Sequence, residues 1–354
     1  MTARSSDPRT DVVQIPTPLA LAESQHVEAV QLSRIDYSTL PNVCDFPTLH
    51  ATVGPFLPGD LWVVGARPGN GKTTLLLNLF DVLMERGFPT IYLTTEIKAA
   101  QMRRVWAAMR LGYPTRDVLE NAWHRLPAGA REAIDESIKW QCLNADIGLF
   151  VDLPYLNSKT VGDALKAYAI RDRYEIVIVD HINRWLPRDN AQKTAEMTQA
   201  VQAFKAVAME HNLNPIIAAQ VNRPQGERSP LADFLPPPIS ALKQTGSLEE
   251  EASVILMLHR ARKADATPAM VKEVALGQRE VKDLLEPDVM CVSVGKHRVR
   301  GGEATGRIVR FRIQTGGRLT DEALVQPSFH FPLAAALPPG REPGDEPEQE
   351  SIPF

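Results

Sequence analysis

The chain has 354 residues, of which 44% are hydrophobic and 23% are charged. This length allows one large α/β domain with flanking segments, and this composition excludes a protein made mainly of membrane spans. The formal net charge of -4 argues against a protein whose whole surface coats nucleic acid, although a local basic loop or the lumen of a ring can still bind a strand.

Residues 1–40 are expected to form an arm rather than a domain. Pro, Ser and Thr are frequent at the start, and "LALAESQHVEAVQLSRI" then shows a short helical pattern of apolar positions before Pro41. The start of the chain lacks the apolar core of a signal peptide, and no later window approaches the roughly 18 uncharged apolar residues of a spanning helix. We therefore expect a cytoplasmic protein with no membrane partner.

Residues 41–333 are expected to form one domain, because apolar runs of strand length alternate there with helical segments. We predict strands at "LWVVGA", "TIYLTTE", "IGLFVD", "EIVIVD", "PIIAAQ", "VILMLH", "VMCVSVGK" and "GRIVRFRIQ". We predict helices at "KTTLLLNLFDVLMERG", "AAQMRRVWAAMRLG", "TVGDALKAYAIRD" and "TAEMTQAVQAFKAVAMEHN". This alternation is typical of an α/β fold with a mostly parallel central sheet flanked by helices. Residues 334–354 are rich in Pro, Gly and Glu and are predicted to be disordered.

A phosphate-binding loop is predicted between the first strand and the first helix of this domain. The stretch "ARPGNGKT" fits the pattern GxxxxGK[ST], except that Ala66 replaces the first glycine. Small residues let backbone N–H groups surround phosphates, and the following helix aims its positive N-terminal end at them. The alternative is a glycine-rich turn before a core helix. We expect nucleotide contacts from Ala66, Arg67, Pro68, Gly69, Asn70, Gly71, Lys72, Thr73 and Thr74.

Individual side chains have predicted roles in binding ATP and Mg²⁺. Lys72 is expected to pair with the β and γ phosphates, and the Thr73 hydroxyl to coordinate Mg²⁺. Open α/β sheets bind ligands at the carboxyl ends of their strands, where three polar residues lie. Glu96 is placed to orient or polarise the attacking water, and Asp180 to reach Mg²⁺ as a Walker B acid. Gln220 is a candidate sensor of the γ-phosphate.

Each strand-end residue also has a plain structural alternative. Glu96 could cap the helix that follows it, and Asp180 could be a solvated strand end. Gln220 could be an ordinary strand-end amide.

Several segments together resemble one family. The segments are "FLPGDLWVVGARPGNGKTTLLLNL", "TTEIKAAQMRRVW", "EIVIVDHI", "IIAAQVNR", "LKQTGSLEEEASVILMLHR" and "VGKHRVRGGEATGRIVRFRIQ". In order and spacing they resemble the C-terminal motor domain of DnaB-type replicative helicases, a RecA-like P-loop ATPase, over roughly residues 36–319. The resemblance is more specific than the phosphate loop alone, which occurs in many unrelated families.

The resemblance implies roles for the residues that match. Lys72 and Thr73 become the phosphate and magnesium ligands, Glu96 the catalytic base and Asp180 the Walker B acid. Gln220 becomes the link between the nucleotide and the DNA-side loops.

The resemblance also implies contacts with a neighbouring subunit and with DNA. Lys296 and Arg298 match the basic pair that such helicases insert into the ATP site of the next subunit, although "KHRVR" alone reads as a solvated basic turn. The segment with Lys243, Gln244 and Gly246 resembles the central loop that tracks single-stranded DNA. It departs from the usual "RESGS" at Lys243 and Gln244, which puts the details of coupling in doubt.

Two further departures stand out. His181 follows Asp180 where an aromatic residue is common, and a packed strand-end histidine is expected there. Because only about 40 residues precede the motor segments, we expect the helical N-terminal collar domain of replicative helicases to be absent. The segment "LAESQHVEAVQLSRI" could still serve as a linker helix that docks on an adjacent subunit.

The C-terminus suggests a partner of its own. Acidic residues followed by Ile352, Pro353 and Phe354 resemble the tip of bacterial single-stranded DNA-binding proteins, which docks on replication and repair enzymes. A terminal Phe can fill an apolar pocket while its carboxylate meets a basic residue. The alternative is a solubilising tail.

The expected function is that of an ATP-dependent DNA helicase, which moves on single-stranded DNA as a homo-hexameric ring in replication or repair. The alternative is a RecA-, KaiC- or RadA-like ATPase that acts as a loading or recombination factor, as a ring or a filament, without unwinding. A nucleotide-switched scaffold and a small-molecule kinase are more distant alternatives. Glu96 weighs against the scaffold, and a kinase leaves "GSLEEEAS" and "GKHRVRGG" unexplained.

Overall fold

The computed structural model describes residues 38–153, 174–182, 190–221, 236–263 and 265–322, with residues 22 and 36 and the short stretches 162–163 and 165–167. The predicted helix before Pro41, most of the predicted helix over residues 160–172 and the tail over residues 334–354 lie outside the described residues. No helix among the described residues combines the length and the apolar character needed to cross a membrane.

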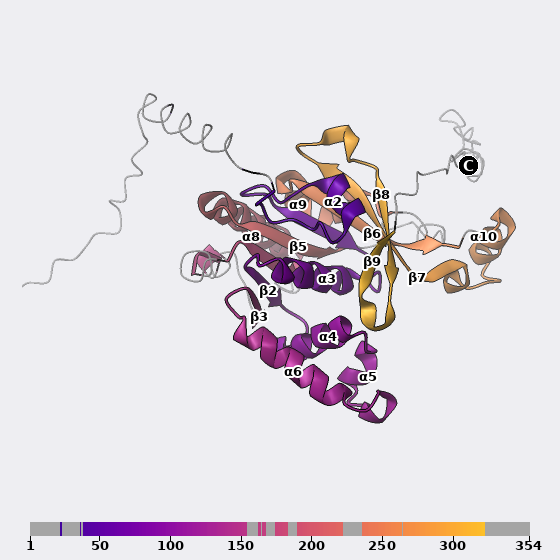
Figure 1. Ribbon diagram of the computed structural model, residues 1–354. Coiled ribbons are helices and arrows are strands. Elements are labelled where there is room, and N and C mark those ends of the chain that lie inside the picture. The colour runs from indigo at the N-terminus through magenta and orange to yellow at the C-terminus, as the bar shows by residue number, and fades with distance from the viewer. Residues whose placement is uncertain are drawn as a thin grey trace, which may run out of the picture.

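A nine-stranded sheet, in the order β3-β2-β4-β5-β1-β6-β7-β8-β9, forms the centre of the fold (Figure 1). The first six strands in this order are parallel, and β6 to β9 pair antiparallel. The strands are β1 (Trp62–Ala66), β2 (Thr90–Thr94), β3 (Gly148–Asp152), β4 (Ile176–Asp180), β5 (Asn214–Gln220), β6 (Val254–Arg262), β7 (Leu285–His297), β8 (Ile308–Ile313) and β9 (Leu319–Glu322). The predicted α/β class and all eight predicted strands are confirmed.

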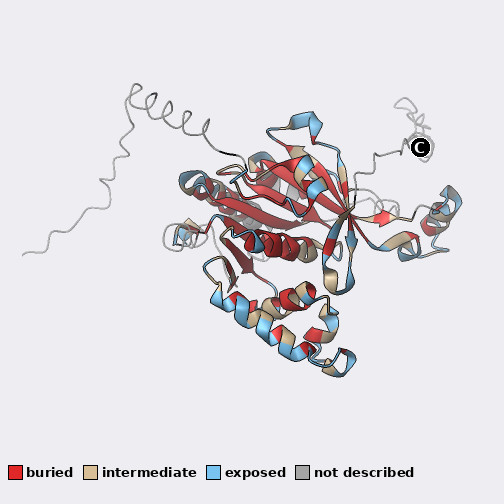
Figure 2. Ribbon diagram, viewed as in Figure 1, coloured by how far each residue is buried: buried red, intermediate tan, exposed pale blue. Residues whose placement is uncertain are grey.

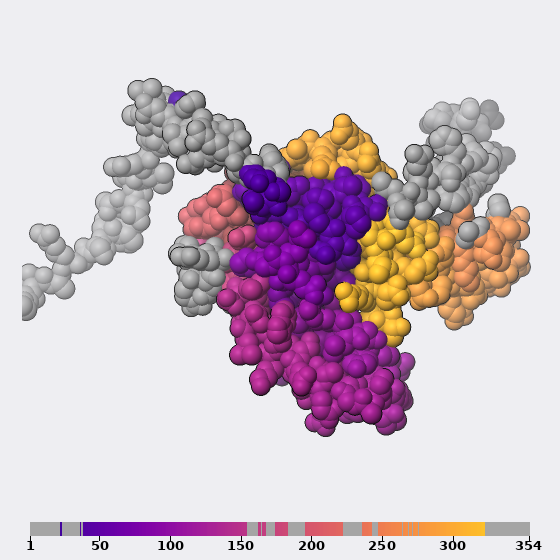
Figure 3. Space-filling view, in the orientation of Figure 1, coloured from indigo at the N-terminus to yellow at the C-terminus, as the bar shows by residue number. Residues whose placement is uncertain are grey.

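Helices cover both faces of this sheet. They are α2 (Pro47–Val53), α3 (Lys72–Glu85), α4 (Ala99–Leu111), α5 (Thr115–Leu119), α6 (Ala130–Leu143), α8 (Asn190–His211), α9 (Gly246–Glu251) and α10 (Pro268–Ala275). Short 3₁₀ turns include η1 (Trp123–Arg125), η4 (Ile239–Thr245), η5 (Val281–Leu284), η6 (Gly301–Glu303) and η7 (Thr315–Gly317). In Figure 3 the segment from α4 to α6 forms a lobe beside the main body, and the segment around α10 projects from another side.

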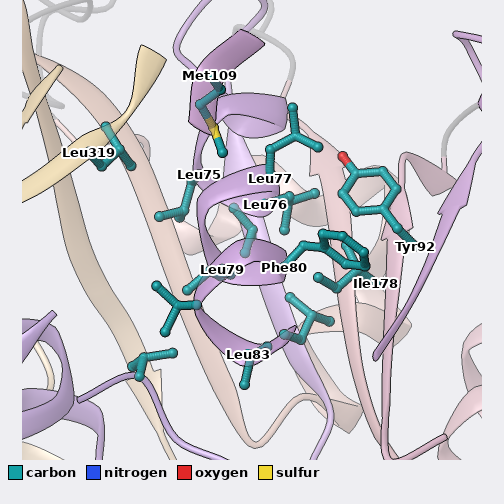
Figure 4. Packing of buried hydrophobic residues seen from close by; sticks show 14 of the residues in the cluster. Leu75, Leu76, Leu77, Leu79, Phe80, Leu83, Tyr92, Met109, Ile178 and Leu319 are labelled. Atoms are coloured by element: carbon teal, nitrogen blue, oxygen red, sulfur yellow. The ribbon is translucent and has the colours of Figure 1, made fainter. Parts of the chain in front are cut away.

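Two apolar cores lie on opposite faces of the sheet, because successive residues of a strand point to opposite sides. In β1, Trp62 and Val64 belong to the core under α3, α4 and α6, whereas Val63 belongs to the core under α8 and α9. The central strands are therefore buried along their whole length (Figure 2). Figure 4 shows the helix α3 packed between the sheet residues Tyr92 and Ile178, Met109 of α4 and Leu319 of β9.

Several elements are present that the sequence patterns did not predict. The strand β9 has one apolar residue, Leu319, and its other residues carry no strand signal. It is tied to α2, because the Asp321 carboxylate accepts hydrogen bonds from the N–H groups of Thr48 (2.6 Å) and Leu49 (3.1 Å). A carboxylate supplied by a distant strand thus caps this helix. The helix α6 does carry a signal, since Ala130, Ile134 and Ile138 recur at helical spacing.

Candidate nucleotide-binding site

The predicted phosphate loop joins the end of β1 to the start of α3 at the carboxyl edge of the parallel strands. Gly69 has φ 77° and Gly71 has φ 85°, in the left-handed region that favours glycine. Gly71 is the N-cap of α3 and offers no side-chain cap, so the first N–H groups of that helix face the loop. Ala66 is the last residue of β1 and has no positive φ, which explains why this position tolerates a residue other than glycine.

The Lys72 side chain lies across this loop. Its Nζ donates a hydrogen bond to the carbonyl oxygen of Ala66 (3.3 Å). Burial lowers the pKa of the Lys72 ammonium, although the carboxylates of Asp180 and Glu96 act in the opposite direction. A partly desolvated cation between two acids is well suited to bind a polyanion.

Asp180 lies at the end of β4, against the start of α3. Its Oδ2 accepts hydrogen bonds from the hydroxyls of Thr73 (2.7 Å) and Tyr92 (2.7 Å). The structure therefore brings together the hydroxyl and the carboxylate that were predicted to share a magnesium ion. Tyr92 was missed by the sequence analysis, because a tyrosine inside a buried strand resembles any other core aromatic residue.

The ends of β2 and β4 are joined through Thr95. The N–H of Thr95 donates to the Asp180 carbonyl (2.9 Å), and the N–H of His181 donates to the Thr95 hydroxyl oxygen (3.1 Å). Glu96 follows Thr95, and its Oε1 lies 3.1 Å from Nε2 of His181. The predicted base is thus close to the Walker B segment, and His181 contacts it rather than being only a packed strand-end residue.

Gln220 lies beside the loop from a third strand. The register of β1 and β5 places Gln220 next to Ala66, and the N–H of Val221 donates to the Ala66 carbonyl (3.0 Å). An amide here is adjacent to the predicted phosphate position, as expected for a sensor.

Lys296 and Arg298 do not join this site within the chain. The register places His297 opposite Val254 at the start of β6, whereas Ala66 lies beside Leu258. Four strand residues separate these positions, which is about 13 Å along the sheet. The basic pair lies at the amino edge, where Lys296 Nζ donates to the Glu249 carbonyl (2.6 Å) at the end of α9.

Arg298 is held at the same place. One of its guanidinium nitrogens donates to the Glu250 carbonyl (3.2 Å), and its N–H donates to the Ser253 carbonyl (2.8 Å). The two predicted finger residues therefore bind the end of the helix that follows the predicted DNA loop.

The predicted DNA-contacting residues lie in the connection between β5 and β6. The backbone of Lys243 and Gln244 belongs to η4, and Gly246 begins α9. Leu242 and Leu248 are buried in the core under α8, so that this connection is anchored to the sheet on both sides of the predicted contacts.

Removing the Tyr92 hydroxyl is expected to impair catalysis while leaving the fold intact. The Tyr92→Phe variant keeps the ring in the core, but it takes one of the two hydroxyl donors from Asp180 Oδ2. The lost bond is worth about 1–3 kcal/mol because it reaches a charged acceptor. We expect steady-state ATP hydrolysis to fall about tenfold and to need more Mg²⁺ for half-maximal rate. Unchanged rate and metal dependence would contradict this role; Tyr113→Phe is the matched control, because the described side-chain partners of Asp180 do not include Tyr113.

Acid is expected to destabilise the fold through His259, which lies on β6 with 4% of its surface exposed. Burial, with a smaller effect from the Arg67 charge, lowers its pKa from 6.5 to about 4. As the pH falls from 6.5 to about 4, the unfolded chain binds a proton that the folded chain excludes. Stability should then drop by about 1.4 kcal/mol per pH unit, in the limit set by this one group.

Urea unfolding between pH 7 and pH 4 measures this slope. His259→Phe should reduce the slope, whereas substitution of the exposed His124 by Gln should leave it as it is. An undiminished slope in His259→Phe would show that other groups cause the acid sensitivity.

The residues present fit a nucleotide with a hard divalent cation. Oxygen donors from Thr73 and Asp180 match the ligand preference of Mg²⁺, and the uncapped helix N-terminus matches an anion. The fold and this site define a RecA-like nucleotide-binding ATPase domain.

The chain belongs to the family of the DnaB-like helicase C terminal domain, whose model matches residues 43–312. It is 26% identical over 261 residues to the replicative DNA helicase DnaB of Leifsonia xyli, which covers 71% of this chain and 54% of the relative. It is 27% identical over 214 residues to the replicative DNA helicase DnaB of Mycoplasma genitalium, which covers 57% of this chain and 43% of the relative. The chain thus spans about half the length of the curated relatives it matches.

Solved structures support the fold. An ATPase domain solved on its own superposes with a TM-score of 0.61 at 17% identity and covers 87% of this chain and 100% of its own. A DnaB-like replicative helicase, solved in a study of its interactions with primase, superposes with a TM-score of 0.61 at 16% identity, over 86% of this chain and 67% of its own.

Proposed function

We propose that this protein is an ATP-driven DNA helicase motor that translocates on single-stranded DNA as a ring of identical subunits. The observation that carries the proposal is the contact between Thr73 and Asp180 beside Lys72 and Glu96, in a chain of the DnaB-like family. A fold that only used the loop as a turn would have no need of a carboxylate hydrogen-bonded to this threonine at the carboxyl edge of the sheet.

The residues of one subunit divide the work on ATP. Lys72 and the N–H groups that begin α3 bind the phosphates, and Thr73 and Asp180 hold Mg²⁺. Magnesium, when bound, would neutralise charge on the phosphate oxygens. Glu96 orients the attacking water and accepts its proton, and Gln220 reports the state of the nucleotide to the neighbouring loops.

The position of Arg298 makes hydrolysis depend on assembly. Since Arg298 lies at the edge of the sheet opposite the phosphate loop, it acts on the ATP of an adjacent subunit rather than on its own. Its bonds to α9 also connect it with the segment that contains Lys243. A shift of that segment on DNA would then move the finger, which supplies a route between DNA binding and hydrolysis.

The DNA contact is assigned to Lys243 and to the backbone around Gly246. A lysine binds the phosphate backbone without reading sequence, as a translocating motor requires. Buried neighbours on both sides hold this segment against the sheet, so that a pull on the DNA is transmitted to the core.

Hydrolysis of ATP with and without single-stranded DNA, together with unwinding of a forked duplex, tests the proposal. We expect stimulation by DNA and unwinding, with Lys243→Ala weakening DNA binding about three- to tenfold and reducing the salt dependence. The exposed Lys272 of α10 provides the control variant, Lys272→Ala. Stimulated hydrolysis without unwinding would favour a loading or recombination factor, and no hydrolysis under any condition would reject the motor.

A further inference from the structure

We propose that His181 is a positioning residue that orients the Glu96 carboxylate for its work on the attacking water. This inference rests on the proposed ATPase function. The Nε2 atom of His181 lies 3.1 Å from Oε1 of Glu96, with 10% of the His181 side chain and 48% of the Glu96 side chain exposed. The imidazole is therefore the fixed member of the pair, and the carboxylate is the member that needs orientation.

The backbone around the pair explains why the imidazole is fixed. The His181 N–H donates to the Thr95 hydroxyl oxygen (3.1 Å), and that hydroxyl lies 3.2 Å from the Asp180 carbonyl and 3.0 Å from the His181 carbonyl. Thr95 immediately precedes Glu96, so the same residue locates both partners. Ile182, which follows His181, is fully buried and anchors the other side.

The second ring nitrogen indicates which proton the ring carries. Nδ1 of His181 is buried and has no hydrogen-bond partner among the described residues. A proton on Nδ1 would be a buried donor without an acceptor, which is unfavourable. The neutral ring with its proton on Nε2 has one donor, and that donor faces Glu96.

A neutral donor has a specific effect on a base. It fixes one carboxylate oxygen of Glu96 without adding a positive charge, so the carboxylate stays ionised and available to accept a proton. Fixing the carboxylate also removes orientations that point away from the nucleotide. His181 therefore acts through Glu96 and contacts neither ATP nor water in this role.

Two substitutions separate this role from packing. His181→Phe removes the donor and keeps a ring, whereas His181→Gln keeps an N–H donor. We expect His181→Phe to lower kcat about tenfold with KM for ATP changed less than about twofold, and His181→Gln to recover most of kcat. In ¹⁵N-histidine NMR of the nucleotide-free protein, the signal that is lost in His181→Phe should be that of a ring protonated on Nε2, and it should shift in Glu96→Gln.

The contrary outcomes are distinct. A kcat of His181→Phe equal to or above that of the native protein, or a ring protonated on Nδ1, would overturn the role of His181. Hydrolysis that does not depend on Lys72 would overturn the proposed function, and with it this role. Normal Lys72-dependent hydrolysis with an unchanged His181→Phe variant would overturn only the inference about His181.

Discussion

Replacing Lys72 by Ala is expected to abolish ATP hydrolysis, with a loss of at least about 100-fold in kcat/KM. Lys72 is the first residue of α3, and its ammonium lies against the Ala66 carbonyl with Asp180 and Glu96 nearby. Without it, the charge developing on the phosphates loses its direct cationic partner, and two acids face the nucleotide without compensation. A hydrolysis assay over a range of ATP concentrations measures the loss.

The structure also predicts that this loss is local. Lys72 is partly buried but belongs to no core cluster, so thermal unfolding of Lys72→Ala should remain within about 0.5 kcal/mol of the native protein. Lys139→Ala, at an exposed position of α6, is the matched control and should hydrolyse ATP normally. Native-like hydrolysis by Lys72→Ala would mean that the loop is a structural turn.

Arg298→Ala is expected to reduce hydrolysis about 1,000-fold, the lower end of the range for an arginine finger. The reason is geometric, because the guanidinium lies at the amino edge of the sheet while the phosphate loop lies at the carboxyl edge. A residue so placed completes the site of a different subunit. Substituting Arg116, whose side chain is 81% exposed on α5, by Ala is the control and should have no effect.

Mixing two inactive variants tests the shared site directly. In rings assembled from equal amounts of Lys72→Ala and Arg298→Ala subunits, about a quarter of the interfaces combine an intact loop with an intact finger. Hydrolysis should therefore reappear on mixing. If the mixture stays as inactive as its components, Arg298 acts within its own chain or has only a structural role.

The sequence predicted the phosphate loop well because the signal is local. Glycine at positions 69 and 71 is required by a positive φ, and the apolar runs before and after the loop predict the strand and the helix directly. The strand-end acids were predicted for a similar reason, since an acid after an apolar run marks the carboxyl end of a buried strand.

The partners of those acids could not be predicted in this way. Tyr92 is one of several aromatic residues that share a core, and only the pairing of β2 with β4 brings its hydroxyl to Asp180. His181 was expected to be a packed histidine, and its approach to Glu96 depends on how Thr95 joins the two strand ends. Contacts of this kind depend on strand order, which has no local pattern.

By itself, the sequence determined the elements that depend on neighbouring residues: the turn of the phosphate loop, the buried strands and the amphipathic helices. Only the tertiary structure decided that Thr73 meets Asp180, 107 residues further along the chain. It also decided that Arg298 lies away from the loop of its own chain. The physical reason is that backbone preferences and apolar periodicity act over a few residues, whereas the strand order and register are set by the burial of both faces of the sheet at once.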